Sequence, residues 1–391
     1  MTNAARLRAW LRVRPVARAS APRPAPRPAT GIAARELAAA LLAAVLLLAV
    51  PPAAVAQQNV LRLFNWNNYI TEDGVRQFEA RCKCRLVQDY FTDNEEMLAK
   101  LAAGATGYDL IVPTGNAVQA LISAGKLRPL DHAKIPNLGN IKSQFLDPWF
   151  DPGNKFSVPY AYSLTILGFN VEKMQELDIP TNTWAALFEP KYLEKLRGRV
   201  TVLDSQRELF AAALIYLGYS ANETDPAKLH QARDVILRAK PYWAAFNAGS
   251  YFKELAVGNI WLAHGYSNDM FTAQQDARNA NRPFTIGYDM PQQGAVFALD
   301  NLVMSKDSQR PDLAYEFIVF WLDGRASAEI TNEIGAGNAN RVAMQWVKPE
   351  IAANRAIFPD PGQFKRLQQL HDFDRATRRL LNRLWVEVKV R

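Results

Sequence analysis

Short apolar segments alternate with amphipathic helical segments in this chain, and this alternation restricts the fold more than any other feature. In the first third, predicted strands at residues 59–64, 86–91 and 108–112 alternate with helices that begin near Asp73 and Asn94. The alternation restarts downstream, with strands at residues 199–203 and 259–264 and helices at residues 206–217 and 269–277. This order predicts an α/β protein with two lobes, each a mostly parallel sheet covered by helices.

Two further segments are predicted to be extended and lie between these repeats. They cover residues 157–170 and 296–304, and either could be a strand that crosses from one lobe to the other. The C-terminal part, residues 349–391, is rich in Arg and Leu and is predicted to be helical. We expect this part to pack against the lobes and to carry no functional residue.

The positive charge of the chain is concentrated in its first 56 residues. The formal net charge is +8, of which +7 comes from eight arginines and one acid, Glu36, in residues 1–56. The remaining residues are therefore nearly neutral, at +1. Bulk charge gives no support to a nucleic-acid surface on this part of the chain.

The same first 56 residues have the pattern of a secretory signal. Arginines precede an apolar run at residues 37–50, which ends at Pro51 and leads to Ala54-Val55-Ala56. The run is short of the roughly 20 residues that a bilayer-spanning helix needs, although an uncleaved anchor stays an alternative. We predict a signal peptide at residues 1–56, cleavage near Gln57 and a periplasmic mature protein.

The only cysteines are Cys82 and Cys84, which are separated by one residue. An oxidising compartment permits a disulfide, but a bridge over so short a loop restricts the geometry. A strained bridge and two free thiols are both compatible with the pattern. A metal site is disfavoured because no histidine or further cysteine is near.

Motifs for catalysis and cofactor binding are missing from the chain. The four histidines are scattered, Gly265 to Asp269 lacks the closing glycine of a nucleophile elbow, and Gly335-Ala336-Gly337 lacks the third glycine of a dinucleotide site. The sequence therefore predicts a protein that is not an enzyme and that uses no cofactor or metal.

The loops that follow the predicted strands combine aromatic, amide and acidic residues. They are residues 65–69, 114–116, 204–208 and 266–269. Ligands bind beyond the carboxyl ends of strands in open α/β sheets. Aromatic rings and carboxylates in such a cleft favour a cationic ligand, through cation–π contacts and charge-assisted hydrogen bonds.

Several of these segments carry motifs of a known family. They are Asn-Trp-x-x-Tyr at 65–69, Asn94-Glu95, Tyr108 to Pro113, Val158-Pro-Tyr160, Leu203 to Glu208 and Leu-Gly-Tyr at 217–219. Over residues 59–388 the chain resembles periplasmic putrescine/spermidine-binding proteins, the substrate-binding components of polyamine ABC transporters. The resemblance implies a hinged, two-lobed clamp of the type II periplasmic-binding-protein fold. It also implies a discontinuous division, with residues 57–160 and 301–344 in lobe 1 and residues 161–300 and 345–391 in lobe 2.

The resemblance also implies ligand contacts in the first and second loops. Trp66 and Tyr69 match ring-forming positions, and the alternative is a half-buried pair that only packs the loop. Asn67 lies beside them and is included as a polar contact. Thr114 matches a ligand-contacting serine, or it is a local cap.

The remaining implied contacts come from the second lobe and a crossing strand. Glu208 matches an amine-binding carboxylate, although Ser205-Gln-Arg-Glu208 also has the pattern of a capping box. Asp269 matches an acid of the putrescine-type members, or it caps a helix. Asp300 matches an ammonium partner, or it forms a hinge salt bridge. Tyr266 stands where the family usually has tryptophan.

Other positions depart from the family pattern. Family acids are replaced by Asn68 and Ser205, and expected aromatic residues are missing near Asn116 and at Ala298 and Ala336. These differences predict a wider, less negative cleft in which a simple diamine loses affinity. Either the ligand is a larger or modified amine, or other residues replace the missing contacts. Candidates for such replacement are Trp243, Phe246 and Tyr251.

These features together predict a monomeric periplasmic protein that captures a polyamine between two lobes and delivers it to the membrane permease of an ABC importer. Three alternatives stay open. The ligand could be an amino-acid derivative, the partner could be a sensory receptor in place of a permease, or the chain could be a hydrolase with Asp204 or Glu208 as its base.

Overall fold

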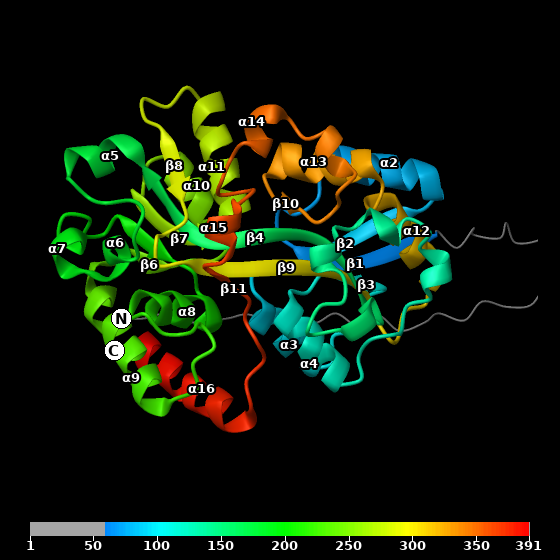
Figure 1. Ribbon diagram of the computed structural model, residues 1–391, viewed down its shortest axis with the longest axis horizontal. Helices are drawn as coiled ribbons and strands as arrows, with labels where there is room; N and C mark the ends of the chain where they lie inside the picture. The colour runs from blue at the N-terminus through cyan, green and yellow to red at the C-terminus, as the bar shows by residue number, and fades with distance from the viewer. Residues whose placement is uncertain (1–58, 391) are drawn as a thin grey trace, which may run out of the picture. The chain divides into compact units, whose positions relative to one another are not determined.

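The computed structural model describes residues 59–390. The predicted signal peptide lies outside these residues. Within them, no helix combines the length and the apolar character needed to cross a membrane. The described residues form one compact unit, in which two long strands run side by side between two groups of helices (Figure 1).

The first half of the unit alternates strands and helices as the sequence predicts. Its elements are β1 (Val60–Trp66), α2 (Glu72–Cys82), β2 (Arg85–Phe91), α3 (Asn94–Ala102), β3 (Leu110–Ile111), α4 (Gly115–Ser123), β4 (Ser157–Asn170), α5 (Val171–Glu176), α6 (Ala185–Phe188), α7 (Pro190–Leu193), β5 (Val200–Val202) and α8 (Gln206–Tyr216). β3 is shorter than predicted. The Asp109 side chain accepts backbone hydrogen bonds just before it, and Pro113 follows it closely.

The second half contains the other long strand and the C-terminal elements. These are α9 (Pro226–Ala239), β6 (Ala245–Phe246), α10 (Tyr251–Ala256), β7 (Leu262–Tyr266), α11 (Ser267–Asn279), β8 (Ile286–Asp289), β9 (Ala295–Met304), α12 (Pro311–Trp321), α13 (Gly324–Ile334), β10 (Gly337–Asn338), α14 (Pro349–Ala352), α15 (Pro361–Phe364), β11 (Leu367–Gln368) and α16 (Arg375–Val390). The C-terminal part is therefore not wholly helical, because β11 pairs with β9 between its helices.

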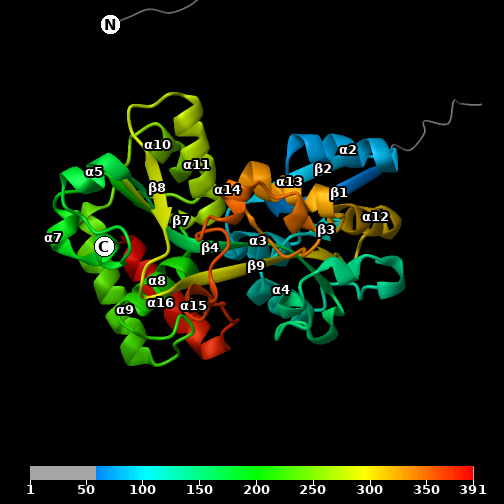
Figure 2. The ribbon, with the colours of Figure 1, turned by 45° about the horizontal axis from the view of Figure 1, so that its top comes forward.

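The main sheet has the strand order β2-β1-β3-β9-β4-β7-β5-β6. β1 pairs in parallel with β2 and β3, and β5 pairs in parallel with β6 and β7. The two long strands between these sets, β4 and β9, are antiparallel to each other and to their neighbours β7 and β3. Both segments predicted to be extended are thus crossing strands, as Figures 1 and 2 show.

Two hydrophobic cores meet along β4, which is buried over its whole length. Leu164 and Ile166 belong to core 1, which gathers around β1, α2, α3 and α12. Leu167 and Phe169 belong to core 2, which gathers around α8, α9 and α16. Because one continuous strand enters both cores, it ties them together through covalent and ladder bonds. α16 contributes buried residues to core 2, as expected for a packing element.

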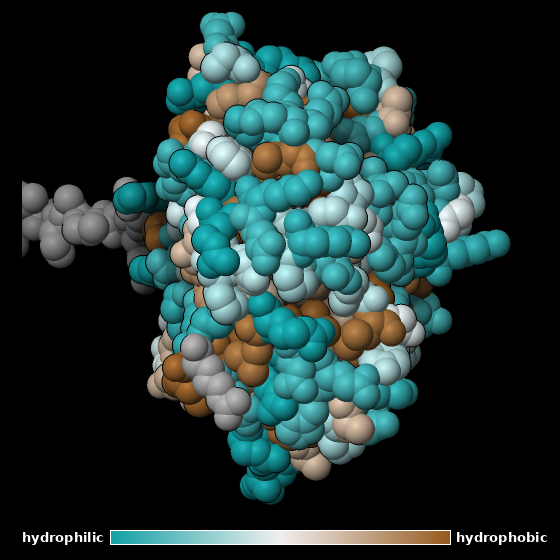
Figure 3. Space-filling model, turned by 90° about the vertical axis from the view of Figure 1, so that its left-hand side faces the viewer, coloured by the Kyte–Doolittle hydropathy of each residue, from teal (hydrophilic) through white to brown (hydrophobic). Residues whose placement is uncertain are grey.

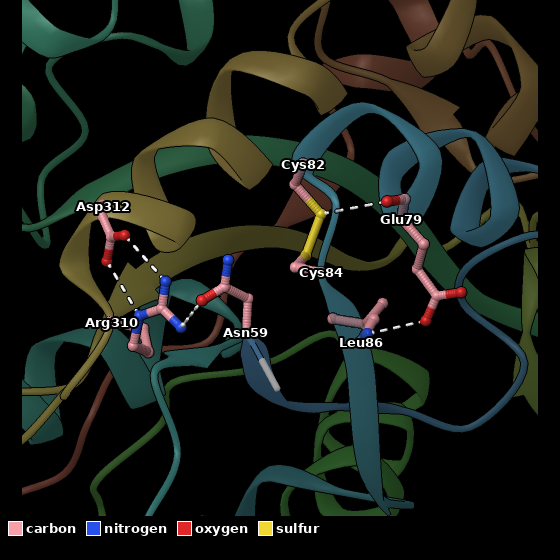
Figure 4. Close-up of a disulfide and its surroundings, with 7 residues drawn as sticks. All are labelled: Asn59, Glu79, Cys82, Cys84, Leu86, Arg310 and Asp312. Atoms are coloured by element: carbon pink, nitrogen blue, oxygen red, sulfur yellow. Dashed lines mark hydrogen bonds and ion pairs between the residues drawn. A yellow bond between two sulfur atoms is a disulfide. The ribbon is translucent and has the colours of Figure 1, made fainter. Parts of the chain in front are cut away.

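Cys82 is the last residue of α2, and Cys84 lies just before the start of β2. The structure joins Cys82 and Cys84 in a disulfide (Figure 4). Lys83, between them, has the left-handed conformation (φ 49°) and caps α2 by donating its N–H to the Glu79 carbonyl. The Glu79 carboxylate then accepts from the N–H of Leu86 at 2.8 Å, which orients β2.

Hydrophilic residues dominate the face of the molecule that is on the left in Figure 1. Figure 3 shows this face, on which hydrophobic residues lie in separate patches between hydrophilic ones. Scattered apolar side chains of this kind are ordinary on surfaces in contact with water.

Candidate functional site

One cavity collects side chains that follow the parallel strands of both sets. It encloses about 550 Å³ of space between atoms, part of it open to solvent. It is lined by all eight predicted site residues, Trp66, Asn67, Tyr69, Thr114, Glu208, Tyr266, Asp269 and Asp300. Seven of them lie at or beyond the carboxyl ends of β1, β3, β5 and β7, and Asp300 lies on β9. This edge is where open α/β sheets bind ligands.

The first wall is formed by the end of β1 and the loop after it. The Trp66 ring packs 4.6 Å from Phe91 and 6.0 Å from Tyr266, between centroids. Tyr69 is buried, and its hydroxyl donates to Asp300 Oδ2 at 2.6 Å. Trp66 and Tyr69 therefore both pack against neighbouring side chains and line the cavity. Their packing role does not exclude either residue from the site.

Thr114 connects the loop after β3 with α3. It stands at the N-cap of α4 but its side chain makes no capping bond. Its N–H donates to Asn94 Oδ1 at 3.3 Å, and its hydroxyl accepts from the Asn94 amide. The local-cap alternative is therefore wrong, and the Thr114 side chain takes part in the cavity wall with Asn94.

Glu208 enters the cavity from the first turn of α8. Ser205 Oγ accepts from the Glu208 N–H at 3.4 Å, which is one half of a capping box. The other half does not form, because the Glu208 carboxylate accepts from Thr165 Oγ1 of β4 at 2.8 Å. Burial raises the pKa of Glu208 to about 7, and the Thr165 hydrogen bond and Arg207 oppose this rise.

Asp269 lies in the first turn of α11, directly after β7. It does not cap this helix, whose N-cap residue is Tyr266. Its Oδ2 accepts from the Tyr251 hydroxyl at 2.6 Å and its Oδ1 accepts from Asn268 Nδ2 at 3.2 Å. Burial raises the pKa of Asp269 to about 7, and the Tyr251 hydrogen bond lowers it.

Asp300 lies at the centre of β9, opposite Thr114. Its side chain is buried, and its Oδ1 has no hydrogen-bond partner among the described residues. Burial raises the pKa of Asp300 to about 8. Within residues 59–390 it forms no ion pair, so the predicted alternative of a hinge salt bridge is wrong.

The cavity thus holds three buried carboxylates from three different elements. No Lys, Arg or His is among the described residues that line it. Taking a carboxylate out of water without a partner raises its pKa and is costly. A ligand with ammonium groups would supply the missing positive charge, and the rings of Trp66, Tyr266 and Phe252 would contact its methylene chain.

Four of the five positions that depart from the family pattern do not line this cavity in the described chain. Asn68 donates to Thr272 at 3.3 Å, Ser205 caps α8, Asn116 lines a smaller adjoining cavity, and Ala336 is buried elsewhere. Ala298 does line the main cavity. None of the three suggested aromatic replacements is among the described residues that line the cavity. Trp243 and Phe246 pack in core 2, and Tyr251 lies behind Asp269.

Eight residues that line the cavity were not among the predicted site residues, namely Phe91, Thr92, Asn94, Ser163, Ala248, Gly249, Phe252 and Asn268. Two of them, Asn94 and Asn268, lie in segments that the sequence analysis singled out. Phe91 ends a predicted strand and Thr92 follows it, so the carboxyl-end rule that selected the loop at residues 65–69 also applies to them. Ala248 to Phe252 follow β6, which is only two residues long and was not anticipated. Asp204, suggested as a hydrolytic base, pairs with Lys389 at 2.7 Å and is not among the lining residues.

Comparison with known proteins places this chain in a family. The profile of the bacterial extracellular solute-binding proteins matches residues 75–359. A putrescine/cadaverine-binding protein of Pseudomonas aeruginosa is 51% identical over 348 residues, which is 88% of this chain and 98% of that protein. The putrescine-binding periplasmic protein PotF of Escherichia coli is 33% identical, over 88% of this chain and 95% of its own length.

Solved structures agree with this assignment. The TpPotD lipoprotein of Treponema pallidum superposes with a TM-score of 0.73 at 28% identity, over 85% of this chain and 100% of that one. The spermidine/putrescine-binding protein PotD of Streptococcus pneumoniae gives a TM-score of 0.70 at 26% identity, over 85% and 99%. The fold class predicted from the sequence is confirmed. The chain belongs to the bacterial extracellular solute-binding proteins, among the putrescine- and spermidine-binding substrate-binding proteins of ABC transporters.

Proposed function

We propose that this chain is a periplasmic receptor for a short linear diamine, which it delivers to the membrane permease of an ABC importer. The observation that carries the proposal is the cavity itself, with Glu208, Asp269 and Asp300 buried and no cationic side chain among its described lining residues. A ligand with an ammonium group at each end suits acids that come from separate elements.

The class of ligand follows from the cavity and from the relatives together. The sequence analysis expects a simple diamine to lose affinity because family acids and rings are missing. Most of those positions lie outside the main cavity, and the relative at 51% identity is named for putrescine and cadaverine. We therefore favour diamines of four or five carbons over longer or acylated polyamines.

We further propose that the ligand acts by closing the two predicted lobes, residues 57–160 with 301–344 and residues 161–300 with 345–391. Hydrogen bonds already join residues of the two predicted lobes. Glu95 of α3 accepts from the Arg207 N–H of α8 at 3.2 Å, and Trp149 Nε1 donates to Gln369 Oε1 at 2.8 Å. A ligand that touches both lobes shifts the equilibrium towards this arrangement.

The remaining parts of the proposal concern location and partners. A cleaved signal peptide at residues 1–56 would export the chain to the periplasm, where it would act as a monomer. The closed lobes would then present one surface to the permease. Binding and release need no covalent step, which fits a family of substrate-binding proteins.

The test is thermal unfolding and calorimetry of residues 57–391 with matched pairs of ligands. Putrescine is compared with ornithine, and cadaverine with lysine, because each pair differs only by a carboxylate. A diamine at 100 times its dissociation constant adds roughly 2.7 kcal/mol and raises the midpoint by several degrees. The amino acids should have little effect, since none of the described residues that line the cavity is a cation that could meet their carboxylate.

Other results would redirect the proposal. A shift with lysine or ornithine equal to that with the diamines would favour an amino-acid ligand. A shift only with spermidine or acetylated putrescine would keep the receptor and replace the ligand class. Turnover of any bound amine would favour the enzyme alternative.

A further inference from the structure

We propose that Tyr251 is a positioning residue of the diamine site, whose hydroxyl, seated against Gly265, holds the Asp269 carboxylate in the orientation that accepts an ammonium group. The inference rests on the proposed function and adds a residue that does not line the cavity itself. It is carried by three observations on α10 and β7, namely a hydrogen-bond chain, a close approach at a glycine, and the loop before α10.

The hydrogen bonds of the Tyr251 hydroxyl determine which group receives its proton. Tyr251 is fully buried, and its oxygen accepts from the Tyr266 N–H at 2.9 Å. A hydroxyl has a single proton to donate, and here it goes to Asp269 Oδ2 at 2.6 Å. One side chain therefore fixes the backbone of Tyr266 and the carboxylate of Asp269, which both line the cavity.

Gly265 provides the space that the Tyr251 ring occupies. A Cβ at position 265 would lie 2.1 Å from Cε2 and 2.6 Å from the hydroxyl oxygen of Tyr251. Any larger residue would therefore push the ring and its hydroxyl away from Asp269. Gly265 does not have a positive φ, so backbone conformation does not require a glycine here. The close approach of the Tyr251 ring does explain why this position of β7 has no side chain.

The loop before α10 fixes the position at which Tyr251 begins the helix. Asn247 Oδ1 accepts from the N–H groups of Gly249 at 3.1 Å and Ser250 at 3.0 Å. The Asn247 N–H donates to Val202 O at the end of β5. This turn is therefore anchored to the sheet on one side and leads directly into Tyr251 on the other.

The consequence for binding follows from the chemistry of a buried carboxylate. Without donors, a buried acid keeps its proton and becomes a poor partner for ammonium. The titratable groups near Asp269 are the tyrosines Tyr251 of α10, Tyr266 of β7 and Tyr69 of the loop after β1, which interact with it electrostatically. The acids Glu208 and Asp300 line the same cavity. Of these, the Tyr251 hydroxyl donates to the carboxylate and stabilises its ionised form.

Tyr251→Phe tests the inference because it keeps the ring in its seat and removes only the hydroxyl. We expect the dissociation constant for putrescine or cadaverine to rise roughly tenfold or more at neutral pH, and the loss to shrink as the pH is raised. Gly265→Ala should reproduce the loss by displacing the ring. Tyr216→Phe, which removes a hydroxyl that donates to Glu189 away from the cavity, is the matched control.

A double-mutant cycle separates positioning from general stability. If Tyr251 acts through Asp269, Tyr251→Phe causes little further loss in an Asp269→Asn background. Losses that simply add, or a Tyr251→Phe variant that binds like Tyr216→Phe, would overturn the inference. A variant that only unfolds at lower temperature but keeps its affinity and pH profile would overturn it as well.

A readout without ligand keeps this inference separate from the proposed function. Carboxyl-carbon NMR of protein labelled at aspartate follows the titration of Asp269 in the unliganded chain. We expect its midpoint to move to higher pH in Tyr251→Phe, and an unchanged midpoint would contradict the inference. Failure of the unsubstituted chain to bind any diamine would instead refute the proposed function and leave this measurement decisive.

Discussion

A buried aspartate lies near each end of β3, and the two aspartates differ in their hydrogen-bond partners. Asp109, just before the strand, accepts from Arg62 N, Ser308 Oγ, Gln309 N and Arg310 N at 2.7 to 3.1 Å. Asp300, opposite Thr114 just after it, accepts from Tyr69 alone and has an oxygen with no partner among the described residues. Their exposed fractions are nearly equal, at 4% and 3%.

The difference shows that burial of an acid does not by itself mark a binding site. Asp109 has protein donors on both oxygens and joins the chain before β3 to the start of α12, so its carboxylate stabilises the fold. Asp300 keeps acceptor capacity that nothing in the described chain uses. Unused capacity at the carboxyl end of a parallel strand is therefore the better indicator of a ligand.

The largest expected effect is on ligand affinity when Asp300 becomes asparagine. Removing the charge that faces an ammonium group should weaken diamine binding by about 3 kcal/mol, roughly a hundredfold. The unliganded chain should unfold at the same temperature or higher, because an amide oxygen still accepts from Tyr69. Calorimetric titration and thermal unfolding measure the two quantities on the same sample. Unchanged diamine affinity in Asp300→Asn would contradict the distinction between a ligand-binding Asp300 and a structural Asp109.

The same substitution at Asp109 should have the opposite pattern. An asparagine at position 109 would place its amide N–H₂ group against another donor. This donor is either the N–H of Arg62, which now meets Oδ2, or the three donors that now meet Oδ1. Leaving buried donors unpaired should lower the free energy of unfolding by about 2 kcal/mol. Diamine affinity should stay the same. Denaturant unfolding of Asp109→Asn beside Asp300→Asn gives the contrast directly, and a loss of affinity at Asp109 would show that the two ends of β3 are not independent.

The sequence predicts the elements that position the site better than the contacts within it. The extended character of residues 157–170 and 296–304 predicts β4 and β9, because long apolar β-type runs read clearly from residue types. The carboxyl-end rule then predicts the loops at residues 65–69 and 114–116, and the family resemblance selects Trp66 and Thr114 within them. Glu208 remained open between a capping box and a ligand contact, because only the side-chain rotamer, directed to Thr165, decides between them.

Tyr251 illustrates what the sequence does not specify. It begins a six-residue helix after a two-residue strand, and neither element has enough periodicity to be recognised. Its partners, Asp269 and Gly265, lie more than ten residues away in the chain. The pairing depends on how α10 packs against β7, which is a tertiary property with no local signature.

The ionisation of the cavity gives a pH dependence with a definite sign. Burial raises the pKa of Asp300 to about 8 and those of Glu208 and Asp269 to about 7, against about 4 in an unfolded chain. Between these values the folded, unliganded protein binds more protons than the unfolded chain, so its stability falls as pH rises. We expect it to be at least about 1 kcal/mol less stable at about pH 8.5 than at about pH 6.5.

Thermal unfolding at those two pH values, with and without putrescine, checks this expectation. The window lies above the ordinary pKa of histidine because buried His264, whose pKa is lowered to about 3, acts in the opposite sense below it. A diamine that binds ionised carboxylates should reduce the pH dependence and release protons on binding near neutral pH. Stability that rises with pH across the window, or binding without proton release, would contradict the assignment.

The smallest expected effect concerns an acid that the family commonly has and this chain lacks. Asn68→Asp restores the charge beside Trp66, and Asp tolerates the left-handed backbone of this position (φ 53°). The Asn68 side chain is exposed and directed to Thr272, away from the cavity lining. An exposed charge is well screened by water and salt. We therefore expect diamine affinity to rise less than about threefold, and less still at high salt.

Calorimetric titration of Asn68→Asp with putrescine at low and high salt measures this effect, and Asn68→Ala controls for loss of the Thr272 contact. A gain of tenfold or more that survives salt would mean that the loop after β1 turns position 68 towards the ligand. The aspartate at position 68 would then differ from both Asp109 and Asp300, because it would become buried only when the ligand binds. A small, salt-sensitive gain would instead show that a carboxylate contributes to this site only where water has already been removed from it.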